Sequence, residues 1–213
     1  MTSFARYYKH KKLINISMSD METLINDHVN QKDIAEYIYE RLYNRFLKIF
    51  DFSCDHKDKY DRNGKIEEKN VFLEEYKNGF LMMTSCSLLI ETLASFIVGQ
   101  NETPRGESTD MFNMVFEYAE TKNNALKVFK KKKDFYKKIR CGLLHQGETY
   151  GKYKISRKGI VLLDYETIDA ALFFKHLKAL LENYRDDLTT GKWDSTEWDA
   201  CRMKIRYIIE NSK

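Results

Sequence analysis

The sequence predicts an all-α globular protein. Its 213 residues include nine glycines and one proline, whereas a β-sandwich or barrel needs a turn signal about every ten residues. Apolar residues recur at three- and four-residue spacings over several long segments, which is typical of amphipathic helices. Hydrophobic residues make up 43% of the chain and aromatic residues 14%, which is ample for a buried core. These observations favour a helical bundle and disfavour a long disordered linker.

The first half of the chain is expected to alternate between helices and polar loops. The polar loops are marked by Asn63-Gly64 and by Pro104, and the longest helix is expected to stop near Gly99. The expected elements, in order, are a helix over 31–50, a loop over 51–66, a helix over 67–98, a loop over 100–110 and a short helix over 111–120.

The second half is expected to hold three more helices and a small β-hairpin. Gly147 and Gly151 are expected to end the first of these helices, and Asp194 with Glu197 resembles a capping box for the last. The expected elements are a helix over 124–145, a hairpin of 153–156 with 160–163, a helix over 167–187 and a final helix to Glu210. We expect residues 1–66 to form an N-terminal helical extension packed on a bundle formed by residues 67–213.

Positive charge is concentrated in one segment. Residues 122–140 contain nine Lys or Arg and one acid, Asp134, although the net charge of the whole chain is only +4. Such a segment indicates a surface for an anionic partner or, equally well, the solvated face of a helix. The candidate RNA-binding residues are Lys130, Lys131, Lys132, Lys133, Lys137 and Lys138.

Residues 80–98 are as long and almost as apolar as a membrane span. A single charge, Glu91, interrupts them, and a carboxylate in mid-bilayer is costly. The central helix of a bundle is the simpler interpretation, so no membrane is expected. The N-terminal residues lack the apolar core of a signal peptide, and the four cysteines are widely spaced, which favours a reduced, cytoplasmic protein. Cys54 and His56 have no second ligand pair, so neither a metal nor a cofactor is expected.

The residues best suited to chemistry are Arg140 and His145, at the end of the basic segment. A histidine takes or gives a proton near neutral pH, and an arginine holds a phosphate through two hydrogen bonds. Such a pair suits RNA cleavage without a metal. Their spacing places them about 140° apart on a straight helix, so a loosened turn at Gly142 and Gly147 is needed to bring them to one cleft.

The run IRCGLLHQGET over 139–149, followed by a small hairpin, resembles the HEPN superfamily of all-helical bundles. Residues 72–96 resemble its early core helix, and the resemblance covers roughly residues 67–188. It implies a metal-independent endoribonuclease that works as a homodimer with a composite cleft. Arg140 would then hold the scissile phosphate and His145 would act as general acid and base, giving a 2′,3′-cyclic phosphate and a 5′-hydroxyl.

The resemblance also implies a role as a toxin or as a phage-defence or abortive-infection effector, and a separate antitoxin or regulator as its partner. Glu91, Cys141 and Gln146 are candidates to line the cleft. Cys141 departs from the polar residue that often follows the motif arginine, which leaves a non-catalytic RNA-, nucleotide- or protein-binding module as the alternative. In the plainest alternative, His145 caps a helix C-terminus and Arg140 is one more solvated cation.

Overall fold

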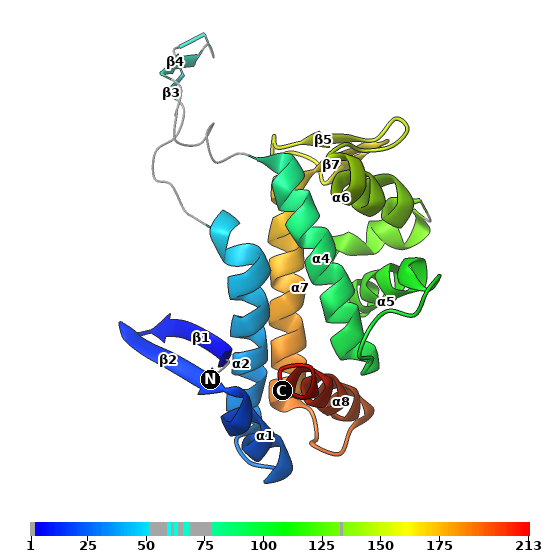
Figure 1. Ribbon diagram of the computed structural model, residues 1–213. Helices are drawn as coiled ribbons and strands as arrows, with labels where there is room; N and C mark the ends of the chain where they lie inside the picture. Colours follow the sequence, from blue (N-terminus) through cyan, green and yellow to red (C-terminus); the bar gives the residue numbers. More distant parts are fainter. Residues whose placement is uncertain (1–2, 52–58, 61, 64–65, 69–77, 133) are drawn as a thin grey trace.

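The computed structural model describes residues 3–51, 59–60, 62–63, 66–68, 78–132 and 134–213. Helix α7 (Ala170–Thr190) lies at the centre and packs against both α2 (Gln31–Leu42) and α4 (Gly79–Val98), as Figure 1 shows. Helices α5 (Ser108–Thr121) and α8 (Thr196–Glu210) pack against α4, and α1 (Met18–Asn26) packs against α8. A single hydrophobic core runs through these helices, with members from Phe4 to Ile209.

The helix predicted over 31–50 is confirmed, although its last turns are irregular. After α2, the chain widens into a π-helical turn, η1 (Tyr43–Leu47), and then tightens into a 3₁₀ turn, η2 (Lys48–Phe50). The short helix predicted over 111–120 lies within α5.

The long helix predicted from residue 67 begins later. Residues 66–68 form a strand, residues 69–77 lie outside the described residues, and α4 starts at Gly79. Asn78 caps it, because its side-chain oxygen accepts a hydrogen bond of 2.9 Å from the backbone N–H of Leu81. The predicted stop is confirmed at Gly99, which has a φ of +71° and lies against the backbone of Ala200 in α8.

Helix α4 is long and apolar enough to cross a membrane by length and composition, but 56% of its most apolar window is buried within the protein. That burial is what the core helix of a soluble protein shows.

The all-α prediction is wrong, because β-strands occur at three places and make the fold mixed. An N-terminal hairpin pairs β1 (Ser3–Lys9) with β2 (Lys12–Ser17), and a short antiparallel pair joins β3 (Lys59–Tyr60) to β4 (Ile66–Glu68). The helical extension predicted for residues 1–66 therefore begins with strands, and part of its polar loop is also strand. The first hairpin was missed because His10 and Lys11, with φ of 49° and 63°, form its turn without glycine or asparagine.

The hairpin predicted after the motif is also wrong in its pairing. Strand β5 (Lys154–Ser156) pairs in parallel with β7 (Thr167–Asp169), and β6 (Leu163–Asp164) pairs antiparallel with β7. Residues 154–156 therefore bond to the segment that was expected to open the next helix. Asp169 ends β7 and caps α7, because its carboxylate accepts a hydrogen bond of 3.0 Å from the backbone N–H of Leu172.

The single basic helix predicted over 124–145 is wrong as well. The chain forms a 3₁₀ helix, η3 (Ala125–Lys131), a π-helical turn, η4 (Tyr136–Cys141), and a short helix, α6 (Gly142–Gln146). Phe129 and Phe135 are at most 1% exposed and their ring centroids lie 5.1 Å apart. Six residues turn a straight helix by about 240°, so the chain must break between these rings for both to enter one cluster.

The last helix is confirmed to Glu210, but its cap lies one residue later than predicted. Ser195, rather than Asp194, precedes α8, and its hydroxyl accepts a hydrogen bond of 3.3 Å from the backbone N–H of Trp198.

Candidate active site

Arg140 of η4 forms an ion pair with Glu91 of α4. The Nη2 atom donates to Oε2 of Glu91 at 3.0 Å, and the two side chains are only 18% and 20% exposed. The guanidinium also lies over the Tyr136 ring, with Cζ 5.3 Å from the ring centroid. The arginine and the glutamate singled out in the sequence are thus brought together from two helical elements. The ring of Tyr136 packs against the guanidinium.

Burial of Arg140 acts to lower its pKa, but the charge of Glu91 and its hydrogen bond outweigh that effect and raise the pKa. Arg140 is therefore a fixed cation at any physiological pH. Within the described part of the chain, its Nε atom is buried and has no hydrogen-bond partner. A guanidinium carries five N–H donors, so donors remain for a second anion.

The backbone around Arg140 is shaped by the chain that returns over it. The N–H of Tyr150 donates a hydrogen bond of 2.8 Å to the carbonyl of Lys138. In a regular α-helix that carbonyl would accept from the backbone N–H four residues later. Gly142 lies under this return, and a Cβ there would collide with the carbonyl oxygen of Glu148. The π-helical turn and Gly142 therefore belong to one arrangement, and π turns are frequent at functional sites.

His145 lies in the last turn of α6, and its side chain is exposed. Gly147 ends this helix with a φ of +69°, as predicted. No hydrogen bond or ion pair joins His145 to Arg140 in the described structure, and the two motif residues lie on different elements, Arg140 on η4 and His145 on α6. Gln146 is exposed beside His145, and Cys141 is a half-buried free thiol next to Arg140.

The predicted RNA-binding lysines whose side chains are described differ in their exposure and in their partners. Lys130 on η3 pairs with Glu120 at 2.6 Å and with Glu117 at 4.0 Å, and the hydrogen bond to Glu120 raises its pKa. Lys132 reaches the backbone oxygen of Tyr165 at 3.5 Å. On η4, Lys137 is exposed, whereas Lys138 is half-buried against Gly151. The side chains of Lys131 and Lys133 lie outside the described residues.

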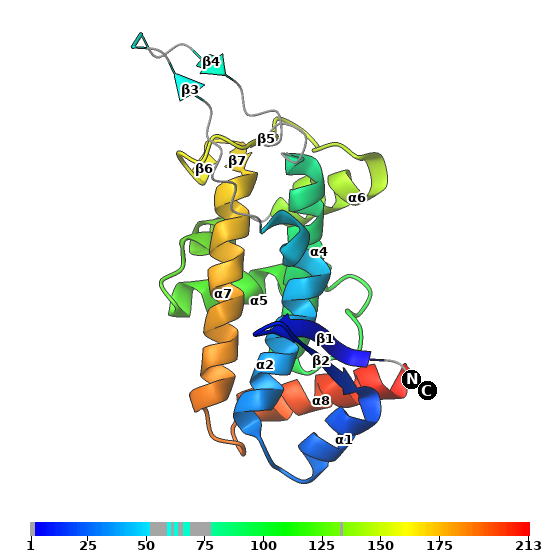
Figure 2. The same ribbon diagram turned by 90° about the vertical axis from the view of Figure 1, so that its left-hand side faces the viewer.

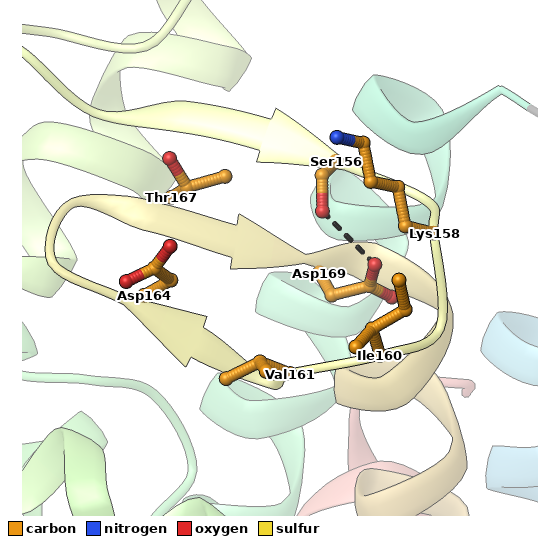
Figure 3. Close-up of a pocket in the computed structure, with 7 residues that line it drawn as sticks. All are labelled: Ser156, Lys158, Ile160, Val161, Asp164, Thr167 and Asp169. Carbon is orange, nitrogen blue, oxygen red and sulfur yellow. Dashed lines mark hydrogen bonds between the residues drawn. The ribbon is translucent and has the colours of Figure 1, made fainter.

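A second polar cluster, which the sequence did not reveal, lies at the sheet. Figure 3 shows a pocket of about 320 Å³ lined by Ser156, Lys158, Ile160, Val161, Asp164, Thr167 and Asp169. Asp169 is 1% exposed and accepts hydrogen bonds of 2.9 Å from the Ser156 hydroxyl and from the backbone N–H of Gly159. Its carboxylate is thus used by the fold, which makes the cluster structural. The position just before an apolar helix was the available signal.

Among the described residues, no group of three or more His, Cys, Asp or Glu side chains is arranged to hold a metal ion. Cys54 and His56, the pair weighed as zinc ligands, lie outside the described residues. Comparisons of this chain with protein-family models, with curated proteins and with solved structures find no match.

Proposed function

We propose that the protein is a metal-independent endoribonuclease of HEPN type that acts as a homodimer. The observation that carries the proposal is the half-buried Arg140, held by Glu91 and Tyr136 with donors to spare, five residues before an exposed histidine. A fixed cation with free donors suits a phosphate, and an exposed imidazole suits proton transfer.

In this mechanism His145 takes the proton of the RNA 2′-hydroxyl, whose oxygen attacks the adjacent phosphorus. Arg140 stabilises the charge that develops on the phosphate oxygens. The bond from phosphorus to the 5′-oxygen breaks, and the leaving oxygen receives a proton from the second histidine of the dimer. The products are a 2′,3′-cyclic phosphate and a 5′-hydroxyl.

The exposed strip of α4 supports a composite site made by two chains. Leu81 and Leu88 lie two turns apart and are 51% and 36% exposed, and Glu91 follows one turn later. A second copy packed on this strip would cover the two leucines and place its own motif beside Arg140. That arrangement would supply a second His145 to the cleft that holds Arg140.

The test is cleavage of end-labelled structured and unstructured RNAs in EDTA. His145→Ala and Arg140→Ala are expected to lose at least about a hundredfold in rate, the usual contribution of an acid–base group or an oxyanion donor. His176→Gln is the matched control, because this half-buried histidine of α7 lies outside the motif. Full activity in both motif variants would refute the mechanism.

A non-catalytic RNA-binding module is the second candidate. It is favoured by the pairing of Arg140 with Glu91, which offsets the charge of the motif arginine, and by Cys141 beside it. In that case RNA is bound and released intact, binding weakens with salt, and replacement of Lys137 weakens it further.

The proposed cellular role is that of a toxin or phage-defence effector in the cytoplasm, and it rests on the motif resemblance. Expression of the wild-type chain is then expected to arrest growth, and expression of His145→Ala is not.

A further inference from the structure

The N-terminal hairpin presents an exposed aromatic ring and an arginine on one face and carries further cations at its turn, whereas Lys9 and its partner Lys12 lie on the opposite face. Between Ser3 and Ser19 the chain has Arg6, Lys9, His10, Lys11 and Lys12 and no acid. Among the described residues only Lys9 of these five has an acidic partner, Glu36 of α2 at 3.7 Å.

The two faces of the hairpin differ sharply. Phe4, Ala5 and Tyr7 are at most 5% exposed and pack toward α2. The carbonyl of Phe4 accepts a hydrogen bond of 2.5 Å from Nη1 of the buried Arg41. The opposite face carries two cross-strand pairs, Arg6 with Asn15 and Tyr8 with Leu13. The hairpin is therefore anchored by its inner face, and its outer face is free.

The outer face combines groups that bind a nucleic-acid strand. Tyr8 is 69% exposed, which is enough for a base to stack on its ring. Arg6 and Asn15 are exposed beside it and offer planar hydrogen-bond donors. Leu13, 39% exposed, is its cross-strand neighbour, and two side chains give too little apolar surface to anchor the hairpin in a bilayer.

The turn supplies further cations at a conformational cost. His10 and Lys11 both have left-handed φ values, 49° and 63°, where a two-residue hairpin turn favours Asn-Gly. Strained residues of this kind are retained where function requires them. The turn extends beyond α2 in Figure 1, and Figure 2 shows the hairpin lying over α2, away from α6.

We propose that this hairpin is a nucleic-acid-binding arm that holds single-stranded RNA, with Tyr8 as the stacking ring and with Arg6 of the outer face and Lys11 of the turn on the phosphates. This inference goes beyond the proposed function, because RNA binding by the hairpin does not depend on RNA cleavage. It adds a second RNA contact surface to the one around Arg140.

The experiment measures binding of the full chain to a fluorescent, fully 2′-O-methylated single-stranded RNA by anisotropy at several salt concentrations. This probe has no free 2′-hydroxyl, so its binding is independent of nuclease activity. Arg6→Ala/Lys11→Ala is expected to weaken binding about tenfold and to lower the salt slope by about 1.4, roughly 0.7 for each cation. Lys175→Ala/Lys192→Ala, which removes two exposed lysines of α7 and the following loop, is the matched control and is expected to bind as the wild type does.

Further variants test whether the Tyr8 ring and the turn residues contribute to RNA binding in addition to the net positive charge of the hairpin. Tyr8→Ile is expected to weaken binding several-fold and Tyr8→Phe to preserve it. His10→Asn/Lys11→Gly is expected to raise the melting temperature and still weaken binding, which a merely structural turn would not do.

Equal binding by the hairpin variants, the control and the wild type would overturn the inference even if the protein cleaves RNA. It would also fail if these variants lost binding only to phosphatidylserine vesicles, since that result would assign the hairpin to a membrane surface. Loss of cleavage in His145→Ala with unchanged probe binding would leave it standing.

Discussion

Asp169 is the buried carboxylate on which the sheet and the central helix both depend. Burial acts to raise its pKa, but hydrogen bonds from the backbone of Gly159 and Leu172 and from the Ser156 hydroxyl outweigh burial and lower it. The ionised form is therefore the one that the folded chain stabilises.

We expect Asp169→Asn to lower the free energy of unfolding at pH 7 by about 2 kcal/mol, because an amide leaves one or more of these donors unpaired. The contribution of Asp169 to the free energy of unfolding is fully present above the usual pKa of an aspartate, about 4. It is lost as the pH falls through the lower pKa of the folded state.

Urea unfolding of wild type and variant across this pH range is the measurement. Asp164→Asn, at an exposed acid of the same pocket, is the control and should stay within about 0.5 kcal/mol of the wild type. A constant difference between Asp169→Asn and wild type down to the lowest pH would contradict the assignment.

Single residues also mark the limit of what the sequence could predict about the site. Glu91 stood out as the one charge in an apolar stretch, and Arg140 as part of a motif. Their contact was not predictable, because 49 residues and several turns of unpredicted geometry separate them. Tyr136 fits the apolar stripe of a helix, although its position four residues before Arg140 already places the two side chains on neighbouring positions of a helix face.

At the scale of elements, the segment that carries the motif was predicted least well. Leu126, Phe129, Tyr136, Ile139 and Leu143 recur at helical spacing, and no glycine or proline interrupts them before Gly142. The spacing correctly indicates helical turns over short stretches. A single continuous helix does not form, however, because Phe129 and Phe135 are buried in one cluster. The N-terminal hairpin was missed for a related reason, since its turn has none of the usual turn residues.

Replacement of Gly142 by alanine is expected to change the stability of the protein in the direction opposite to that expected from helix propensity. Alanine is favoured over glycine inside a helix by about 1 kcal/mol, and Gly142 has an ordinary helical φ of −58°. We nevertheless expect Gly142→Ala to destabilise the protein by about 2 kcal/mol, because its Cβ has no room beside the backbone of Glu148.

Chemical denaturation measures the effect of Gly142→Ala. Gly147→Ala is the comparison, since its Cβ would enter open space and its cost is only the strain of a φ of +69°, about 1 kcal/mol. If Gly142→Ala proved more stable than the wild type, the close approach of the returning chain would be refuted.

At the scale of the whole molecule, the core helices were predicted correctly, whereas the strands and the segment that carries the motif were not. Long apolar periodicities place α2, α4 and α7 in the core, because a helix that is apolar on most sides must be surrounded. The strands after α6 have only two or three residues, which are too few for periodicity to be informative. The longer strands β1 and β2 were missed because their turn lacks the usual turn residues.

The proposed dimer is a property of the whole molecule, and the exposed strip of α4 tests it. Leu88→Glu is expected to convert the protein to a monomer in sedimentation velocity and to abolish RNA cleavage, because a charge would be buried in the interface. Helical content should not change, since Leu88 is 36% exposed in the single chain.

Ile160→Glu is the matched control for this change. Ile160 is 77% exposed in the loop after β5 and is not part of the leucine strip of α4. It should leave the dimer and the cleavage intact, and a dimer that survived Leu88→Glu would place the interface elsewhere.

The phenylalanine cluster links distant parts of the chain to the motif. Phe173 of α7 stacks on Phe135 with ring centroids 5.6 Å apart, and Phe135 immediately precedes the turn that holds Arg140. In genetic terms, substitutions in this aromatic cluster are expected to give the same loss-of-function phenotype as substitutions in the motif. Temperature-sensitive alleles from random mutagenesis should therefore gather at Phe112, Phe116, Phe129, Phe135 and Phe173, although none of these side chains can carry out the chemistry of His145.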